Sequence, residues 1–373
     1  MKIVINAYSA RQGGGQTYLI NLLQHLPEQN PPQIEVFAPR SLQLPEHPCI
    51  RRVHASWPTE NPLLRAVWER WLLPRYLKRT GADVLFCPGG LVATRAPKSC
   101  RVVTMFRNMT PFDDSALRRM SWGLQRIRNH MLRGLMLRSM HEADLTIFIS
   151  DFARGVIEAI TSIPNPVTIP HGISEAFRSG GNVLPRPAIA GDGPYLLYVS
   201  KMDSYKHHEE VVRGYAQLSE EVRARCRLVL AGEADSADAD RLRRIIAELR
   251  LGNRVVICGA VNYRELPALY QNAEANLFAS SCENCPNILL EALAAGRPVL
   301  SSNVDPMPEF GGQEIGYFSP FDPASIAQAM RRVLEEPETA TRWATAARER
   351  SVKYDWKLTA RETWNAIRRL DQM

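Results

Sequence analysis

The sequence predicts an α/β protein of two doubly wound, Rossmann-like domains that face each other across a cleft, and three observations support this. The chain has 373 residues, which exceeds what one hydrophobic core usually organises. Short apolar runs alternate with helical patterns along both halves, as in parallel α/β layers. Between the halves, residues 178–194 are rich in glycine and proline and show no periodicity, which is typical of a linker.

The apolar runs predict the strands. Six fall in the first half, at residues 2–7, 34–39, 83–88, 101–106, 145–150 and 166–172. Five more follow the linker, at residues 195–200, 226–232, 254–259, 275–280 and 298–302. We therefore expect a first domain over 1–180, a linker over 181–193 and a second domain over 194–354. Ligands of such domains bind at the carboxyl ends of the strands, so we expect the two binding crevices to line one cleft.

Composition favours a cytoplasmic protein. Hydrophobic residues make up 45% and charged residues 23% of the chain, as in ordinary globular proteins. No run approaches the ~18 apolar residues of a membrane span, and the first ten residues have the pattern of a buried strand and not of a signal peptide. Seven scattered cysteines, an odd number, favour a reducing compartment over a disulfide scaffold.

Basic charge is concentrated in the first half. Residues 1–180 contain 22 Lys and Arg against 13 Asp and Glu, whereas the remaining residues contain 24 against 26. This asymmetry indicates an anionic partner for the first domain, which is a membrane, a nucleic acid or a phosphorylated acceptor.

Two helical patterns carry much of that charge. Residues 115–141 contain six arginines and no acid. Their apolar residues recur at three- and four-residue steps and predict an inward stripe, made of Leu117, Met120, Leu124, Ile127, Met131 and Leu135. On the opposite face, near Trp122, lie Arg119, Arg126 and Arg133, which would contact either solvent or an anionic membrane. Residues 61–79 place Trp68 and Trp71 among basic residues, and this second helix favours a lipid surface.

The densest chemical signal is SSCENCPNILLEALAAGRPVLSS, residues 280–302. A loop with Glu283 leads to Pro286, which suits a helix start. The free N–H groups of Asn287 and Ile288 at that start would suit a pyrophosphate. Glu291 follows in the helix, so the two carboxylates flank the anion site. Each is also consistent with an ordinary surface acid when taken alone.

Further motifs accompany it. Lys201 and Lys206 follow the first strand of the second domain, five residues apart. A glycine run, Gly13–Gly15, follows the first strand of the chain and opens a helix. Ser150, Phe152 and Arg154 follow another strand, and Pro170 and Gly172 form a turn. Together with the Glu-x7-Glu spacing of Glu283 and Glu291, these motifs resemble the retaining glycosyltransferases of family 4, which have the GT-B fold, and among them the mannosyl- and rhamnosyltransferases.

The resemblance implies residue roles. Glu283 would bind sugar hydroxyls and Glu291 the ribose, while Lys201 and Lys206 would neutralise the leaving nucleoside diphosphate without a metal or other cofactor. Gly14 and Gly15, with Asn287 and Ile288, would also contact the donor. The family mechanism is drawn as front-face displacement in which the leaving phosphate accepts the acceptor's proton. Residues 355–373, with Trp356 at a kink, would be the terminal helix that returns to the first domain.

The sequence departs from the family pattern in two places. Many relatives carry a His-Asp pair where this chain has Phe106, Arg107 and Asn108. Arg107 and Asn108 are therefore hypotheses for contacts with the sugar or the acceptor. A second donor motif, usually G-G-x-P-E, keeps only Pro308 and Glu309.

Four other groups suggest different chemistry. Cys282 and Cys285 form a C-x-x-C without a second pair, which argues against zinc. Asp238 and Asp240 form an Asp-x-Asp, a metal motif elsewhere, but they precede a helical run where Asp caps the N-terminus. His207 and His208 are expected in an exposed turn, although one is also a candidate for donor contact. The role of His171 stays open.

We expect a hexosyltransferase that uses a nucleotide-sugar donor, GDP-linked ahead of UDP-linked. Its acceptor would be a lipid-linked saccharide in bacterial surface polysaccharide assembly, of the O-antigen or exopolysaccharide kind within lipopolysaccharide biosynthesis. The enzyme would be peripheral to the inner membrane, on its anionic surface. The alternatives are a nucleotide-sugar epimerase of the same fold and a basic nucleic-acid-binding protein, which the pI of about 9.1 suggests. The second alternative leaves the glutamate motif unexplained, so no nucleic acid is expected as a partner.

Overall fold

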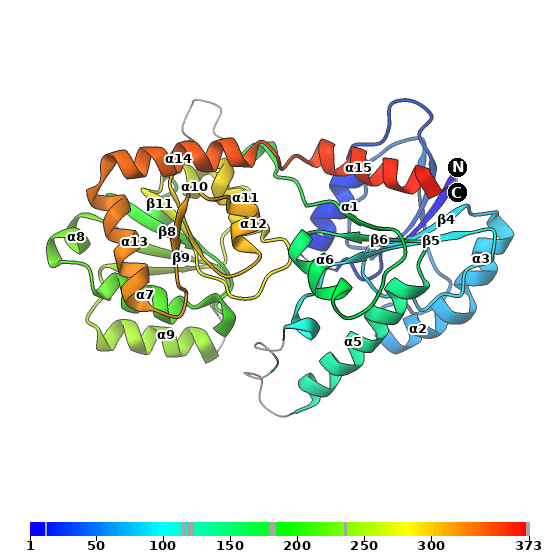
Figure 1. Ribbon diagram of the computed structural model, residues 1–373, viewed down its shortest axis with the longest axis horizontal. Coiled ribbons are helices and arrows are strands. Elements are labelled where there is room, and N and C mark those ends of the chain that lie inside the picture. Colours follow the sequence, from blue (N-terminus) through cyan, green and yellow to red (C-terminus); the bar gives the residue numbers. More distant parts are fainter. Residues whose placement is uncertain (12, 114–116, 118–122, 179–183, 235–236, 371–373) are drawn as a thin grey trace. The chain divides into compact units, whose positions relative to one another are not determined.

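The chain forms two compact units (Figure 1). The structure is a computed structural model that describes residues 1–373 except 12, 114–116, 118–122, 179–183, 235–236 and 371–373. Unit 1 contains Met1–Gly172 and Trp356–Met373, and unit 2 contains Ile173–Asp355. Unit 2 begins before residue 180 because Ile173 and Phe177 are buried in its hydrophobic core. Within the predicted linker, residues 181–183 lie outside the described residues, and Ala190 is buried in the core of unit 2.

Unit 1 is built on a seven-stranded parallel sheet. Its strands are β1 (Lys2–Asn6), β2 (Gln33–Phe37), β3 (Ile50–Val53), β4 (Val84–Cys87), β5 (Arg101–Phe106), β6 (Leu145–Phe148) and β7 (Pro166–Thr168). They lie in the order β3-β2-β1-β4-β5-β6-β7, with Ile3 opposite both Ile34 and Val84. The direction of winding therefore reverses between β1 and β4, which is the topological switch point where such sheets bind ligands.

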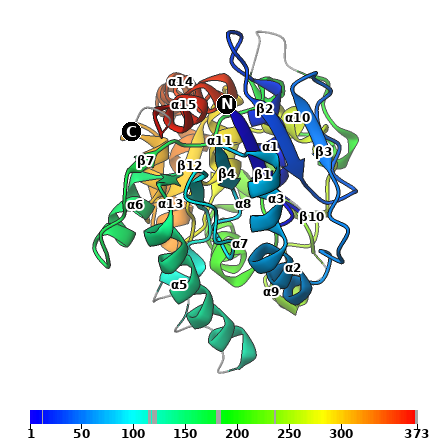
Figure 2. The ribbon, with the colours of Figure 1, turned by 90° about the vertical axis from the view of Figure 1, so that its right-hand side faces the viewer.

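Helices cover both faces of this sheet (Figure 2). They are α1 (Gly14–Gln24), α2 (Pro62–Trp71), α3 (Leu73–Thr80), α5 (Leu124–Glu142), α6 (Asp151–Glu158) and α15 (Trp356–Arg369), with a 3₁₀ turn η1 (Thr110–Phe112). Asn61 and Ser150 accept backbone N–H bonds and so cap α2 and α6. The terminal helix α15 joins unit 1 by packing on α1, where the Trp364 indole donates to the His25 carbonyl at 3.1 Å.

Unit 2 repeats the architecture with six parallel strands. They are β8 (Tyr195–Val199), β9 (Arg227–Ala231), β10 (Val255–Gly259), β11 (Ala275–Phe278), β12 (Val299–Ser302) and β13 (Gly316–Phe318), in the order β10-β9-β8-β11-β12-β13. Its switch point lies between β8 and β11. The helices are α7 (His208–Ala216), α8 (Glu220–Arg225), α9 (Ala237–Glu248), α10 (Leu266–Asn272), α11 (Asn287–Ala294), α12 (Met307–Gly311), α13 (Pro323–Glu335) and α14 (Pro337–Ser351). Three 3₁₀ turns, η2 (Glu175–Phe177), η3 (Ala188–Ala190) and η4 (Ser204–Lys206), complete the unit.

Two parallel, doubly wound sheets confirm the predicted fold class. Each of the eleven apolar runs named above overlaps a strand. The short edge strands β3 and β13 were not predicted. No helix among the described residues has both the length and the apolar character that crossing a membrane requires.

The faces of α5 differ from the prediction. Ile127, Met131 and Leu135 are 59%, 65% and 50% exposed, so this part of the predicted inward stripe is wrong. Met136 and Met140 are buried instead. Arg126 and Arg133 are half-buried, and the guanidinium of Arg133 lies 5.4 Å from the ring centroid of Phe112. The helix therefore turns an apolar row outwards and two predicted surface arginines towards the protein. Arg119, Met120 and Trp122 lie outside the described residues.

The predicted helix over 61–79 is divided into α2 and α3. Trp68 is buried against Tyr8 and Phe37 in the core of unit 1, so it is not a lipid contact. Trp71 is 61% exposed. It shares the outer surface of α2 with three other exposed apolar residues, Leu63, Leu64 and Val67.

Candidate active site

The site of unit 2 lies where two loops leave neighbouring strands. The loop after β8 and the loop after β11 are joined at three points. The Ser281 amide donates to the Tyr205 carbonyl at 3.0 Å, and the Ser281 hydroxyl bonds to His207 Nε2 at 2.8 Å. The third connection is an ion pair between Lys206 and Glu283. Since β8 and β11 are hydrogen-bonded neighbours, these loops form the crevice at the switch point of unit 2.

Lys206 is a buried cation in this crevice. The residue is 6% exposed, and its ammonium bonds to Oε1 of Glu283, whose side chain is 17% exposed. The same nitrogen lies 4.9 Å from the ring centroid of Tyr205 and 5.3 Å from that of Phe278. Coulombic interactions are stronger where water is excluded, so a charge held here acts more strongly on a bound anion than a surface lysine does. The structure thus brings two predicted site residues together.

Lys201 lies in a different environment. It follows the same strand, but its ammonium pairs with Glu233 at 2.8 Å and its side chain is 60% exposed. An exposed pair contributes little to stability, so this lysine keeps the conformational freedom to reach a ligand.

The second half of the site is the start of α11. Pro286 immediately precedes the helix, and Asn287 and Ile288 are its first two residues, as predicted. The prediction of a free N–H group at Asn287 is wrong, because this amide donates to the Cys285 carbonyl at 3.0 Å. Glu291 is half-buried one turn later, where the Tyr263 hydroxyl donates to its Oε1 at 3.1 Å. Burial raises the pKa of Glu291 to about 8, against the lowering effect of the Tyr263 hydrogen bond. At neutral pH this carboxyl is therefore mostly protonated and able to donate a hydrogen bond. Sequence reasoning missed Tyr263, which belongs to no motif.

The adjacent histidines are buried, so the prediction of an exposed turn is wrong for both. His207 adopts a positive φ of 53° between η4 and α7, and its ring reaches Ser281. His208 stacks on Tyr198 with ring centroids 4.5 Å apart. Burial, together with the nearby charge of Lys206, lowers the pKa of His208 to about 3, so it remains neutral. Both histidines hold the loop that carries Lys206.

Four predicted site residues belong to unit 1. Gly14 and Gly15 begin α1, and a Cβ added at Gly15 would lie 3.1 Å from Nη1 of Arg107. The Arg107 guanidinium also lies 6.0 Å from the Tyr18 ring centroid, so it is held against the start of this helix. Asn108 accepts the Thr110 amide at 3.2 Å, which is a local turn contact. Phe106 packs in the core with Phe112 and Phe148. Arg107 is therefore the residue of the Phe106–Asn108 segment that lies beside the glycine loop.

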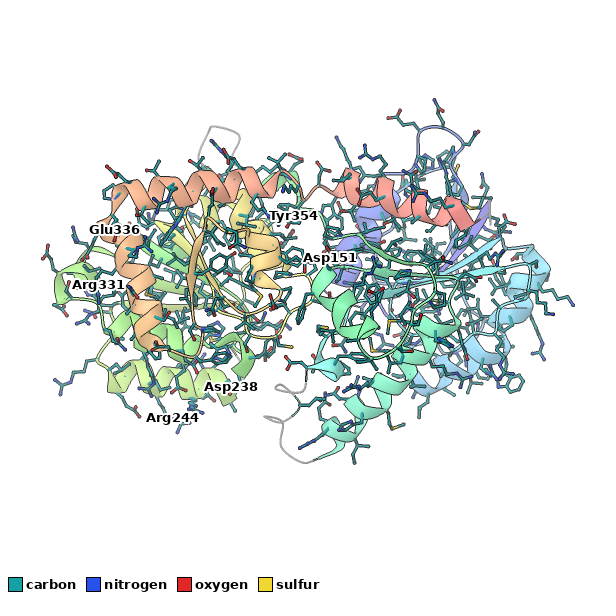
Figure 3. The ribbon with its side chains drawn as sticks, viewed as in Figure 1. Asp151, Asp238, Arg244, Arg331, Glu336 and Tyr354 are labelled. Atoms are coloured by element: carbon teal, nitrogen blue, oxygen red, sulfur yellow. The ribbon has the colours of Figure 1, made fainter. Side chains whose placement is uncertain are left out.

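The structure also describes the two sequence motifs that suggested a metal site, Asp238 with Asp240 and Cys282 with Cys285. Asp238 and Asp240 lie in the first turn of α9, where Asp238 is exposed (Figure 3). Asp240 pairs with Arg243 at 2.7 Å. Cys282 and Cys285 are half-buried in the loop before α11. Within the described ranges, no three His, Cys, Asp or Glu side chains are placed to hold a metal ion.

His171 is buried between the rings of Tyr18 and Trp356, each 5.5 Å away, and packs as a core aromatic.

Two family models match the chain. The model described as "Glycosyltransferase Family 4" matches residues 12–177, and the model described as "Glycosyl transferases group 1" matches residues 183–350. The second match contains Lys201, Lys206, Glu283 and Glu291. The chain spans less than half the length of the first curated relatives that it matches.

Individual relatives agree with these models. "O-antigen chain mannosyltransferase B" of Escherichia coli is 28% identical over 250 residues, which cover 63% of this chain and 64% of the relative. A Campylobacter jejuni enzyme named "N-acetylgalactosamine-N,N'-diacetylbacillosaminyl-diphospho-undecaprenol 4-alpha-N-acetylgalactosaminyltransferase" is 25% identical over 97% of this chain and 98% of its own. Among solved structures, sucrose-phosphate synthase from Thermosynechococcus elongatus is 21% identical, with a TM-score of 0.76 over all of both chains. That structural likeness supports the same two-domain fold.

Proposed function

Since the chain belongs to the group 1 and family 4 glycosyltransferases, we propose that it transfers a mannose- or rhamnose-type hexose from a GDP-linked donor to a lipid-linked saccharide, with retention of configuration. The product would belong to bacterial surface polysaccharide. The observation that carries the proposal is the buried pair of Lys206 and Glu283 beside the start of α11. A cation, a carboxylate and the N-terminus of a helix together suit a sugar diphosphate.

Each part of the crevice has a task in this proposal. Lys206 neutralises the charge that develops on the leaving diphosphate, with help from Lys201 and from the positive end of α11 at Asn287 and Ile288. Glu283 accepts hydrogen bonds from sugar hydroxyls. Glu291, fixed by Tyr263, binds the ribose diol. The cations come from side chains, so the charge on the leaving group can be balanced without a metal ion.

The choice of donor is supported by similarity. The Escherichia coli relative is named as an O-antigen chain mannosyltransferase, and the alignment covers nearly two thirds of each chain. A mannose-type donor with a guanosine carrier is accordingly our first choice, and a UDP-linked donor is the second.

The proposal of a lipid-linked acceptor rests on the outer surface of unit 1. Ile127, Met131 and Leu135 form a row on α5, spaced one helical turn apart and at least half exposed. The side chain of Arg138 on the same helix is 63% exposed and pairs with Glu142 at 2.8 Å, and Arg128 is also exposed. An apolar row with adjacent arginines suits the surface of an anionic membrane, where both hydrophobic burial and charge attraction contribute. The name of the Campylobacter jejuni relative also specifies a diphospho-undecaprenol acceptor.

A thermal-shift series with GDP, UDP, ADP and dTDP tests the donor. A nucleotide present at 100 times its Kd stabilises a protein by ~2.7 kcal/mol, so GDP should raise the unfolding temperature most. Lys206→Ala should lose most of this shift. Lys353→Ala, which removes an exposed lysine of the same unit, is the matched control and should keep it. A larger shift with another nucleotide would refute the GDP assignment.

Sedimentation with vesicles tests the membrane contact. Replacing Ile127 and Met131 with Gln keeps good helix formers on α5 but removes the two most exposed residues of the apolar row. This variant should no longer sediment with phosphatidylglycerol vesicles, while transfer to a short water-soluble saccharide should change little. Ile160→Gln with Val352→Gln removes exposed apolar residues elsewhere and should still sediment. Equal sedimentation of the α5 variant and the wild type would contradict the proposal.

A further inference from the structure

Two cysteines flank Glu283 in the loop between β11 and α11. Cys282 and Cys285 form a C-x-x-C and are the closest pair in the sequence among the seven cysteines of the chain. Both are half-buried, and the structure holds both as thiols and not as a disulfide. The residue that pairs with Lys206 therefore lies inside the ring that a disulfide between these two thiols would close.

Most of the other thiols are shielded from reaction. Cys87, Cys100 and Cys226 are buried. Burial raises the pKa of Cys100 and of Cys226 to about 12, and it also raises the pKa of Cys87 and of Cys258. Because the thiolate is the form that attacks a disulfide, these four thiols react slowly. The C-x-x-C pair is more accessible and lies directly before α11, and the positive end of a helix favours a thiolate.

Backbone hydrogen bonds hold the loop on both sides of the C-x-x-C pair. On one side, the Ser281 amide donates to the Tyr205 carbonyl at 3.0 Å. On the other side, the Cys285 carbonyl accepts the Asn287 amide at 3.0 Å, which ties it to the start of α11. The two flanks of the loop are therefore anchored to neighbouring elements, and a new bond between the cysteines must be accommodated by the residues that lie between them.

Of the two residues between the cysteines, Glu283 has more room to move. A disulfide usually holds its two Cα atoms ~4.4–6.8 Å apart and allows a narrow range of torsion angles, so closing a ring over two residues constrains their backbone. Asn284 is 5% exposed, whereas the side chain of Glu283 is 17% exposed. The constraint therefore falls on the carboxylate that pairs with Lys206.

We propose that Cys282 and Cys285 form a reversible disulfide, and that this bond moves Glu283 away from Lys206. The oxidant is a low-molecular-weight disulfide. One cysteine thiolate attacks a sulfur of the oxidant and expels a thiolate, and the second cysteine then attacks the mixed disulfide and expels the other. Two protein thiols are thereby oxidised to one disulfide, the oxidant is reduced to two thiols, and the protons of the cysteines pass to the expelled thiolates.

The disulfide connects the donor crevice to the thiol balance of the surroundings. C-x-x-C pairs have reduction potentials near that of the glutathione pool, so the ratio of oxidised to reduced glutathione decides which form is present. In the proposed function Glu283 binds the donor sugar, and the oxidised chain should therefore lose transfer. This consequence rests on the proposed function, whereas the disulfide and the movement of Glu283 do not.

Peptide mass spectrometry in glutathione buffers tests the disulfide. As the proportion of oxidised glutathione rises, the peptide that contains Cys282 and Cys285 should lose the mass of both thiol hydrogens, and dithiothreitol should restore it. Cys49→Ser removes a half-buried cysteine of unit 1 and is the matched control, which should behave as the wild type does. The proposal is refuted if this peptide keeps both thiols in oxidised glutathione, or if it only carries attached glutathione.

Acetylation by an activated ester tests the movement of Glu283. Lys206 is 6% exposed, so it should react slowly in the reduced chain. In the oxidised chain its rate relative to the exposed Lys353 should rise about tenfold, the scale of losing one charge-assisted hydrogen bond. Dithiothreitol should reverse the rise in the wild type, and Cys282→Ser combined with Cys285→Ser should prevent it.

The relative acetylation rate of Lys206 decides the proposal even where the disulfide forms. An oxidised wild type in which this rate equals that of the reduced chain would show that Glu283 stays in place, and the proposal would fail. A failure of the proposed function would look different. The reduced chain would then turn over no GDP-linked donor, while the mass of the cysteine peptide and the acetylation of Lys206 would still respond to glutathione.

Discussion

The raised pKa of Glu291 predicts that the stability of unit 2 depends on pH. Its pKa is raised to about 8 in the folded chain, whereas an ordinary glutamate titrates near 4.3. The folded state therefore binds this proton more tightly than the unfolded state does. The resulting stabilisation is fully present below the unfolded pKa, decreases as pH rises above it, and is lost as pH passes the folded pKa.

The size of the effect follows from the two pKa values. Between pH 5.5 and pH 8.5 this carboxyl alone should lower the free energy of unfolding of unit 2 by roughly 3 kcal/mol, or by about 2 kcal/mol if the folded pKa were one unit lower. Glu291→Gln keeps the shape of the side chain and removes the titration. The difference in stability between wild type and variant should thus change by that amount over this range, in favour of the variant at high pH.

Urea unfolding at pH 5.5, 7.0 and 8.5 measures this difference, followed through the transition in which unit 2 unfolds. Tyr263→Phe is a second variant. Since the Tyr263 hydrogen bond lowers the pKa of Glu291, its removal should shift the pH dependence to higher pH. A stability difference between wild type and Glu291→Gln that stays constant within about 0.5 kcal/mol over the range would refute the reasoning, because linkage allows no constant difference for a group that titrates there.

Two further predictions concern turnover. Lys206→Ala should lower turnover at least ~100-fold, and it should also destabilise unit 2 because the Glu283 carboxylate loses its ion-pair partner. Lys206→Met combined with Glu283→Gln should recover stability but not turnover, and recovery of both would mean that the pair is structural. Transfer should also survive EDTA, since lysines supply the positive charge. A loss that manganese or magnesium restores would contradict this, and Asp238 and Asp240 would then become the first candidates for metal ligands.

The fold was predictable because parallel strands are buried on both faces and therefore appear as continuous apolar runs. Of the two strands that were not predicted, β3 has a physical explanation. Its residues are IRRV, and at the edge of the sheet Arg51 can stay in solvent while it pairs with Glu35. Charged residues at sheet edges oppose pairing with other chains, so an edge strand need not carry the apolar signature.

The faces of α5 show a limit of periodicity. Ile127, Met131 and Leu135 have helical spacing, but so do the buried residues Met136 and Met140. When apolar residues lie on both faces, spacing alone does not indicate which face the sheet covers. Glu69 and Tyr263 were missed for a different reason. Neither belongs to a local motif, and their partners, Asn6 and Glu291, are distant in the sequence.

In both units polar side chains gather at the switch point of a parallel sheet, where such sheets bind ligands. The side chains at the two switch points suit different ligands. At the switch point of unit 2 the loops after β8 and β11 supply a buried cation, which suits a diphosphate. At the switch point of unit 1, between β1 and β4, α2 supplies the carboxyl of Glu69, which accepts the Asn6 amide at 2.9 Å. These side chains belong to units with separate hydrophobic cores.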